Sequence, residues 1–305
     1  MSNLTYRSWQ EGDDLALLQI LGDPSTPQAH IDRTMLRADS DDPWARTLVA
    51  VDDGVPVGAG TLFESSLHPD RLWLFVEVAP SMRRQGVATE LLRRLREFPA
   101  PSGVTALKSR FTVEGAEGEA AAAFTASLGQ EQIMRSRGVV VEPGALKLPV
   151  FDEAGLTLEE AATGSVELSQ VVADYYNAVH DWDRAQMTLG RAQTMLLNDA
   201  TGAKGAIVLR DKPKDADGKI LSFAISYEPD RVDAPADVLM GWDPTLSDAD
   251  AREAVRGLLA MLAHQYPVKL EVDDAMAPLS DLVDELMAAG QATVVTTTII
   301  VANAG

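Results

Sequence analysis

The chain alternates short apolar runs with amphipathic segments, and this pattern predicts a mixed order of strands and helices. The run LWLFVEV at Leu72–Val78 is apolar at nearly every position, which is typical of a strand buried on both faces. The segment Gly86–Phe98 instead spaces its apolar residues at helical intervals. Such an order predicts an α/β fold (an α+β mixed sheet) with helices on both faces of the sheet.

The same reasoning assigns the other elements of the first half. Further strands and helices are expected as follows: strands at Leu4–Ser8, Thr47–Asp52, Val55–Glu64, Leu107–Val113 and Ile133–Val141, and helices at Asp13–Leu21, Gln28–Ala38 and Glu117–Ser127. The tetrapeptide DDGV between two of the apolar runs is a turn signal, so these two strands should form a hairpin.

The two halves of the chain share one plan, although the residues themselves have diverged. A short strand, a turn and a helix begin at Leu4 and again at Leu156. A strand, a proline, a polar turn and an amphipathic helix recur around Pro80 and Pro244, and each half ends in a helix, a glycine and a strand. Three landmarks in the same order indicate an internal repeat.

A proline- and glycine-rich stretch separates the two copies. Residues 143–155 contain Pro143, Gly144, Pro149 and Gly155, which is typical of a linker. The sequence therefore predicts domains at residues 1–142 and 156–305.

Composition and charge narrow the function classes. No residue of the 305 is a cysteine, which excludes disulfides, thiolate metal sites and cysteine nucleophiles. There is no secretion signal and no apolar run long enough to cross a bilayer, so a cytoplasmic protein without a membrane partner is expected. The net charge of −20 argues against nucleic-acid and anionic-membrane partners. Residues 151–305 hold 26 acidic and 11 basic side chains, against 20 and 15 in residues 1–150, so an anionic ligand favours the first half.

The junction VAPSMRRQGVATELL carries the strongest candidate chemistry. A helix that begins near Gly86 leaves its first N–H groups without partners and points its positive dipole end outward. Gly86 and Ala88 have no side chain or a small one, so a ligand can approach the backbone closely. Arg83 and Arg84 add positive charge, as an anion site requires. A helix start with solvated arginines fits these features equally well, so both interpretations are open at this point.

The arrangement Arg83-x-x-Gly86-x-Ala88, after a strand that ends Val78-x-Pro80, resembles the acetyl-CoA motif of the GCN5-related N-acetyltransferase (GNAT) family. That motif is (Gln/Arg)-x-x-Gly-x-(Gly/Ala) at the same strand–helix junction. The resemblance extends in element order through the first half, and the second half resembles the same fold without the motif. Its turn reads SDADAR, whose carboxylates would repel a pyrophosphate. The resemblance implies two tandem GNAT-like domains, one of them degenerate.

The resemblance also implies how acetyl-CoA would be held as the acetyl donor, with no metal. The pyrophosphate would be bound by the backbone of the turn and first helical residues, namely Arg83, Arg84, Gln85, Gly86, Val87, Ala88 and Thr89. Val76 and Val78 would hydrogen-bond the pantetheine arm, and the Val78 N–H would polarise the thioester carbonyl. An amine would then attack the thioester directly.

The proton-transfer groups are less well defined. Glu77, the single charge in its strand, is a candidate general base, or else an acidic pocket wall or a salt-bridged glutamate. Glu64 and His68 are weaker candidates. The alternative for His68 is a loop histidine without a catalytic role. The family often places a tyrosine acid four residues before the glycine of its late helix, but that position, before Gly129, is Thr125.

The acceptor implied by this reasoning is a small-molecule or peptide amine, and the acidity of the chain favours a cationic one. Thr125, at the position where the family often has a tyrosine, supports an alternative: a non-catalytic sensor or scaffold that binds acetyl- or acyl-CoA. A structural protein that uses neither site is a third option. The tetrapeptide HDWD at His180–Asp183 contains metal-ligand types, but without a second histidine nearby a turn between helices is favoured. The acceptor, the oligomeric state and any ligand of the second domain are open.

Overall fold

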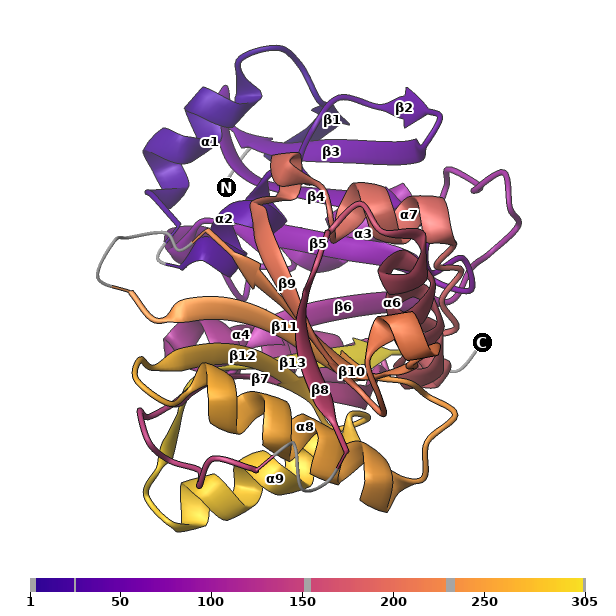
Figure 1. The fold of residues 1–305 in the computed structure, drawn as a ribbon. Coiled ribbons are helices and arrows are strands. Elements are labelled where there is room, and N and C mark those ends of the chain that lie inside the picture. The colour runs from indigo at the N-terminus through magenta and orange to yellow at the C-terminus, as the bar shows by residue number, and fades with distance from the viewer. Residues whose placement is uncertain (1–3, 25, 151–154, 229–233, 304–305) are drawn as a thin grey trace. The chain divides into compact units, whose positions relative to one another are not determined.

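The computed structural model describes residues 4–24, 26–150, 155–228 and 234–303. The chain divides into two compact units (Figure 1). Unit 1 comprises Met1–Arg110, Ala123–Glu131 and Val301–Gly305, and unit 2 comprises Phe111–Ala122 and Gln132–Ile300. The two predicted domains are continuous stretches of sequence and stay a prediction, but the mixed α/β fold with helices against a sheet is confirmed.

The sheet of unit 1 has its strands in the order β1-β3-β4-β5-β6, and β2 pairs with the edge of β3. All these pairs are antiparallel except β5 with β6, which are parallel. The strands are β1 (Leu4–Ser8), β2 (Ser40–Asp41), β3 (Trp44–Asp52), β4 (Val55–Phe63), β5 (Leu72–Val78) and β6 (Leu107–Thr112). The hairpin expected around DDGV is the β3–β4 pair.

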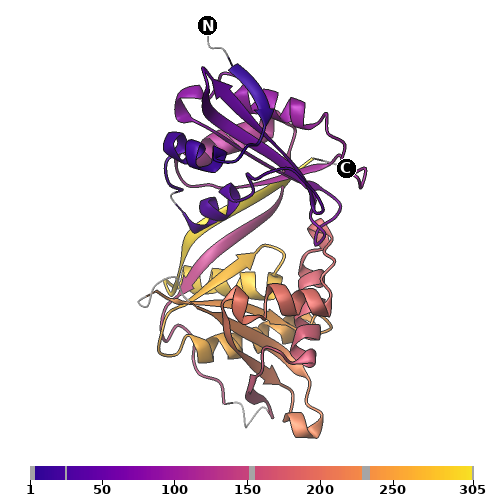
Figure 2. The same cartoon turned by 90° about the horizontal axis from the view of Figure 1, so that it is seen from above.

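Helices cover both faces of the unit 1 sheet, as Figure 2 shows for the indigo to violet part of the chain. They are α1 (Asp13–Leu21), α2 (Pro27–Arg33), the short 3₁₀ helix η1 (Pro80–Met82), α3 (Val87–Leu95) and α4 (Gly115–Ser127), whose last residues belong to unit 1. Leu91 and Leu95 of α3 are fully buried against one face, and Leu17 of α1 is buried against the other. Every α3 position that packs inward is apolar, which explains its helical pattern.

Helix α2 is shorter than the sequence pattern predicts. The Thr26 hydroxyl caps its start by accepting the Ala29 N–H at 3.1 Å. After Arg33, the Leu36 N–H donates to the Arg33 carbonyl at 3.0 Å, so the chain tightens into turns instead of continuing as an α-helix to Ala38.

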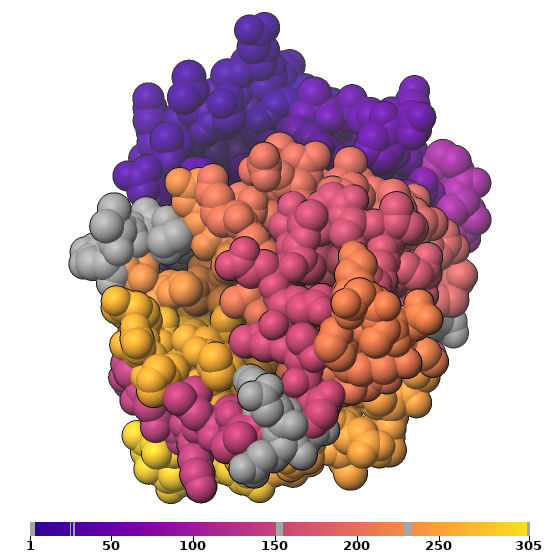
Figure 3. Space-filling view, in the orientation of Figure 1, coloured from indigo at the N-terminus to yellow at the C-terminus, as the bar shows by residue number. Residues whose placement is uncertain are grey.

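Unit 2 repeats the plan with seven strands in the order β13-β7-β12-β11-β10-β9-β8. They are β7 (Glu131–Val141), β8 (Thr157–Ala161), β9 (Ala203–Arg210), β10 (Ile220–Tyr227), β11 (Ala236–Trp242), β12 (Val268–Asp273) and β13 (Ala292–Ala302). Its helices are α6 (Val166–Val179), η2 (Asp181–Asp183), α7 (Leu189–Met195), η3 (Asp199–Thr201), η4 (Lys214–Ala216), α8 (Asp248–Leu262) and α9 (Ala277–Ala288). In Figure 3 the magenta to salmon segment from β8 to α7 forms much of the surface of unit 2 that faces the viewer.

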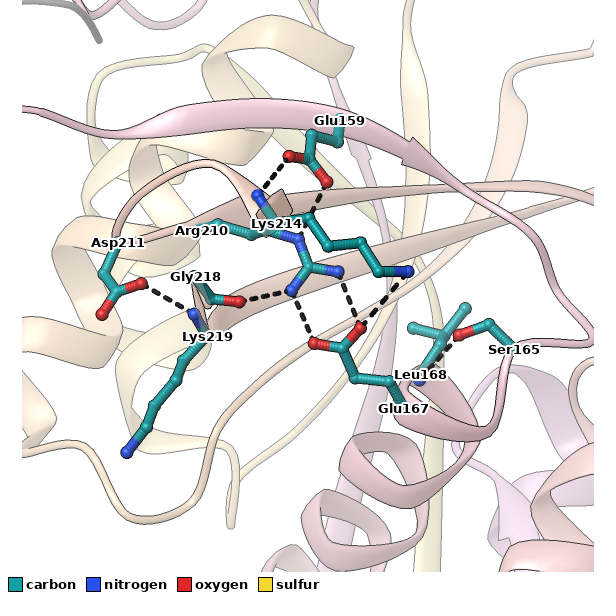
Figure 4. A network of polar contacts seen from close by, with 9 residues as sticks. All are labelled: Glu159, Ser165, Glu167, Leu168, Arg210, Asp211, Lys214, Gly218 and Lys219. Carbon is teal, nitrogen blue, oxygen red and sulfur yellow. Dashed lines mark hydrogen bonds and ion pairs between the residues drawn. The ribbon is translucent and has the colours of Figure 1, made fainter. Parts of the chain in front are cut away.

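A buried guanidinium joins three elements of unit 2 (Figure 4). Arg210 of β9 is 2% exposed and donates to Glu159 of β8 at 2.9 Å. It also donates to both carboxylate oxygens of Glu167, in the first turn of α6, at 2.5 and 2.9 Å, and to the Gly218 carbonyl at 2.7 Å. Bidentate geometry of this kind fixes orientation as well as charge, so the network sets where α6 begins against the sheet.

An aromatic cluster lies under α6 in the same unit. The ring of Tyr175 makes edge contacts with Phe223 and Trp242, with centroids 5.4 and 4.9 Å apart. A Cβ at Gly241, which lies between these two strands' aromatic residues, would collide with the Phe223 ring and come within 2.9 Å of Tyr175. Glycine at this position is therefore what leaves room for the rings of Phe223 and Tyr175.

Among the described residues, each helix is too short or too polar to span a lipid bilayer.

Candidate functional site

The turn between β5 and α3 has an uncommon backbone. Arg84 has φ of 63° and Gly86 has φ of 82°, so both lie in the left-handed region. Gly86 is the residue that precedes the first turn of α3, and no side chain caps this end of the helix. A Cβ at Gly86 would meet nothing within 4 Å, so glycine is required by conformation and not by space.

Most N–H groups of this turn make no backbone hydrogen bond among the described residues. The Arg83 and Glu90 N–H groups donate to the carbonyls of Pro80 and Gly86 at 3.3 and 2.9 Å. Between them, across the described residues, the backbone N–H groups from Arg84 to Thr89 donate to no other backbone group. Consecutive N–H groups in a left-handed turn at a helix N-terminus form a concave anion site. The predicted pyrophosphate-binding backbone therefore has the geometry that a phosphate requires.

Strand β5 separates from its parallel neighbour before it reaches this turn. In the described chain β5 pairs with β6 only at its start, Leu72 with Leu107 and Trp73 with Lys108. The rest of β5 continues to Val78 alongside β4 alone. One edge of β5 is therefore open over its second half.

The alternation of backbone groups along β5 shows which residues use this open edge. Leu72 donates its N–H to a carbonyl on the β6 side at 2.9 Å, and Ala79 donates to a β4 carbonyl at 2.9 Å. Because successive strand residues point their N–H groups to opposite edges, those of Val76 and Val78 face the β6 side. These are the two residues that the family resemblance assigns to the pantetheine arm.

The predicted basic residues take different places around the turn. The Arg83 Nε donates to the Val78 carbonyl at 3.1 Å and so links the turn to the end of β5. Arg84 and Thr89 are exposed, Ala88 is half-buried and the Val87 side chain is buried in the core. The Gln85 side chain donates to the Ser81 carbonyl at 2.9 Å. Arg84 is therefore the guanidinium most open to an approaching anion.

The basic run further along α3 is engaged with carboxylates. Arg93 binds Glu90 at 2.8 Å and Glu97 at 2.6 Å, and Arg94 binds Glu90 at 2.7 Å. The hydrogen bond from Arg93 is the main cause that lowers the pKa of Glu90 to about 2. These arginines therefore form an ion-paired, solvated face of α3.

The corresponding turn of unit 2 is closed by a side chain. The Ser247 hydroxyl accepts the Asp250 N–H at 3.2 Å and donates to the Asp250 carboxylate at 2.7 Å, at the start of α8. This cap uses an N–H group that remains open in unit 1 and adds negative charge beside it. This arrangement agrees with the prediction that the second copy does not bind an anion at this turn.

Glu77 is held in an ion pair. Both of its carboxylate oxygens accept hydrogen bonds from the Arg33 guanidinium, at 2.6 and 2.9 Å. Of the alternatives left open by the sequence, this is the salt-bridged glutamate. Its role as a base stays a prediction, and it would require Glu77 to leave Arg33 before accepting a proton.

The other candidates lie in loops and helices beside the sheet. Glu64 accepts the Ser102 N–H at 3.0 Å, and His68 is 9% exposed in the β4–β5 loop. Thr125, at the position where the family often has its tyrosine, is 5% exposed in α4. Neither Glu64 nor His68 is brought into contact with Glu77 by any hydrogen bond described for this part of the chain.

Sequence reasoning missed a second ion pair on the same face as Glu77. The carboxylate of Asp32, next to Arg33 on α2, accepts from Arg110 of β6 at 2.5 and 2.8 Å. Lys108 and Arg110 also lie over the Trp73 ring, 4.5 and 5.4 Å from its centroid. The signal was available in the predicted strand itself, because Lys108 and Arg110 are two positions apart and share a face, where a charge that becomes buried must find a partner.

The fold and the turn define an α/β protein with an uncapped, left-handed strand–helix junction. A family model described as the acetyltransferase (GNAT) family matches residues 15–129, which include β5, the turn and α3. Residues 15–129 thus match the GNAT acetyltransferase family, which supports a general acyl-transfer role for this part of the chain. No curated protein matches the chain significantly.

Solved structures agree at the level of the fold. A GCN5-related N-acetyltransferase from Sphaerobacter thermophilus is 15% identical with a TM-score of 0.61, over 98% of this chain and 95% of that one. A tandem GNAT protein from the clavulanic acid biosynthesis pathway is 15% identical with a TM-score of 0.59, over 98% of each chain. A glucosamine N-acetyltransferase region of a fungal multi-domain enzyme is 15% identical with a TM-score of 0.66, over 99% of this chain and 38% of that one. The fold of two tandem GNAT-like units is thereby confirmed.

The residues present fit the acyl-CoA that this family uses. The open N–H groups suit a pyrophosphate, and the open edge of β5 suits an extended arm with amide groups that can hydrogen-bond to a strand. In the described residues no group of three or more histidine, aspartate or glutamate side chains is placed to hold a metal ion.

Proposed function

We propose that unit 1 is an N-acetyltransferase that transfers the acetyl group of acetyl-CoA to a primary amine. The observation that carries this proposal is the uncapped start of α3, with its left-handed Arg84 and Gly86, at the end of a strand with one open edge. Unit 2 has the same strand and helix, but Ser247 caps the helix there. The two helix starts thus differ in whether their first N–H groups are free to bind a phosphate.

In this proposal each group has a definite task. Acetyl-CoA supplies the acetyl thioester when it is bound. The N–H groups of Arg84 to Thr89 hold the pyrophosphate, and those of Val76 and Val78 orient the pantetheine arm. The Val78 N–H then stabilises the negative charge that develops on the carbonyl oxygen as the neutral amine attacks. The acceptor is a small-molecule or peptide amine.

A non-catalytic acyl-CoA sensor is the second candidate, and two observations favour it. Thr125 replaces the tyrosine that often acts as the acid, and Arg33 occupies both oxygens of Glu77. Under this alternative the chain binds acetyl-CoA and transfers nothing.

Thiol release with a panel of amines, peptides and aminoglycosides separates the two candidates, with calorimetry of acetyl-CoA binding done in parallel. The acetyltransferase requires amine-dependent release of CoA at a rate well above hydrolysis. Tight binding without turnover on any acceptor supports the sensor, and absence of binding contradicts both.

A further inference from the structure

We propose that the α2 strap, defined as residues 26–35, is held on the sheet of unit 1 by ion pairs and opens to expose the carboxylate of Glu77 to a cationic amine. In the closed strap, the Arg33 guanidinium occupies both oxygens that an ammonium group would use. The opening of the strap follows from the fold alone, whereas the part of the proposal that concerns the amine rests on the function proposed for unit 1.

The strap lies between two apolar anchors and contributes none itself. Leu17 of α1, before the strap, is 1% exposed, and Leu36, directly after it, is 6% exposed; both belong to the same apolar cluster. Of the strap side chains that the structure describes, none is buried, and Ile31 is 49% exposed. Apolar packing therefore fixes the chain on either side of the strap and does little to hold the helix between.

Two adjacent side chains link the strap to the sheet. Arg33 donates to the two carboxylate oxygens of Glu77 on β5 at 2.6 and 2.9 Å. Asp32 accepts from the guanidinium of Arg110 on β6 at 2.5 and 2.8 Å. In the described part of the chain, the other hydrogen bonds of the strap reach only its own residues, Gly22 or the residue that follows the strap. Ionic contacts thus take the place that apolar contacts have in α1 and α3.

Both ion pairs are partly in contact with water. The side chains of Arg33 and Glu77 are 16% and 23% exposed, and those of Arg110 and Asp32 are 29% and 14% exposed. Partly exposed ion pairs contribute little net stability and are weakened by salt. The closed strap is therefore in a balance that a competing ion can shift.

The two strand partners differ in what they keep when the strap opens. The Arg110 guanidinium lies 5.4 Å from the centroid of the Trp73 ring, so it retains a contact without Asp32. The Glu77 carboxylate has no partner other than Arg33 among the residues that the structure describes. A half-buried carboxylate left without a positive partner is unfavourable, and an ammonium group offers a charge and three donors. An open strap therefore favours a cation at Glu77, directly before Val78.

Hydrogen exchange of the full chain, followed by mass spectrometry, tests the strap. The amides of His30 and Thr34 donate within it at 3.0 and 3.2 Å, so their exchange reports its opening. In the double variant Asp32→Asn, Arg33→Gln, the strap should exchange about tenfold faster or more, while α3, which is held by apolar packing, is unchanged. Raising NaCl from about 0.1 M to about 1 M should act in the same direction on the parent chain, since the screening length falls from about 10 to about 3 Å.

Arg7→Gln is the matched control. It removes another guanidinium of unit 1 that binds both oxygens of a carboxylate, here that of Asp13 at 2.7 Å each, at the start of α1 and outside the strap. Exchange of the strap should stay within about twofold of the parent chain, because distant sites act independently. Acceleration equal to that in the double variant would show a general loss of stability and would overturn the strap.

The part that concerns the amine is tested by exchange of the parent chain in n-butylammonium chloride and in sodium chloride at equal ionic strength. The organic ammonium ion should speed exchange of the strap by about threefold or more relative to sodium, because it binds Glu77 only when the strap is open. Arg33→Gln should also lower the KM for any amine that is turned over and leave the KM for acetyl-CoA unchanged.

Each part can be overturned separately. Equal exchange of the strap in the double variant and the parent chain overturns the strap. Equal effects of sodium and n-butylammonium overturn the exposure of Glu77 to an amine. Absence of turnover with every amine contradicts only the function proposed for unit 1, since neither exchange measurement requires acetyl-CoA.

Discussion

The guanidinium of Arg33 binds both carboxylate oxygens of Glu77, at 2.6 and 2.9 Å. The pair joins the end of α2 to the C-terminal end of β5, and the two side chains are 16% and 23% exposed. Glu77 thus links a helix to a strand through its ion pair. Variants of Glu77 and Arg33 can therefore separate a structural role of Glu77 from a role as general base.

If the ion pair is mainly structural, Glu77→Gln and Arg33→Gln should each lower the free energy of unfolding by about 1 to 2 kcal/mol. The double variant should then be less unstable than the sum of the two, because a coupled pair is removed together. Urea denaturation of the four proteins measures this. Turnover discriminates further, since a catalytic base predicts that Glu77→Gln abolishes activity while Arg33→Gln retains it. Equal losses from both variants would contradict a base.

Gly86→Glu should abolish acetyl-CoA binding, because a carboxylate would then stand beside the open N–H groups in a strained left-handed residue. Gly12→Glu is the matched control. Gly12 also precedes a helix with φ of 89°, so it imposes the same backbone strain away from the proposed site. Calorimetry with acetyl-CoA should show binding for the control alone. Retention of binding by Gly86→Glu would rule out this turn as the phosphate site.

Arg210→Met should lower the free energy of unfolding by about 2 kcal/mol, less than for a wholly buried pair because its carboxylate partners keep some contact with water. The hydrogen bond from Arg210 lowers the pKa of Glu167 below its unfolded value. That contribution is fully present above the unfolded glutamate pKa of about 4.3 and is lost as the pH falls through the folded value. The stability gap between parent and variant should therefore narrow below about pH 4. A gap independent of pH would contradict this account.

Ser247→Ala should destabilise the chain by about 1 kcal/mol through loss of the helix cap at α8. Ser165→Ala, which removes the equivalent cap of α6, should have a similar effect and serves as the comparison. Denaturant titration measures both, and acetyl-CoA affinity should be unchanged in either. Gain of acetyl-CoA binding by Ser247→Ala would show that the cap alone keeps unit 2 from binding it.

Much of the fold and of the candidate site is predictable from the sequence because it depends on local signals. The run Leu72–Val78, the proline after it and the glycine at 86 determine a strand, a turn and a helix through nearest neighbours alone. The pairing of β7 with β12 could not be predicted in this way. Val141 of β7 pairs with Val268, which is more than a hundred residues away, and no local pattern identifies that partner. The sequence left open a salt-bridged Glu77, but it could not name Arg33 as the partner for the same reason. From the sequence alone, Asp32 and Arg33 on α2 are expected to be exposed to solvent, because the strands that they contact are not known.

Gly241 in unit 2 occupies the place along β11 that Glu77 has along β5, one residue before the strand's last position. The rings of Phe223 and Tyr175 fill the space that any side chain at Gly241 would need. A charged side chain at Gly241 would therefore require both rings to move. As long as this aromatic cluster is in place, the second copy cannot hold a counterpart of Glu77 on this strand.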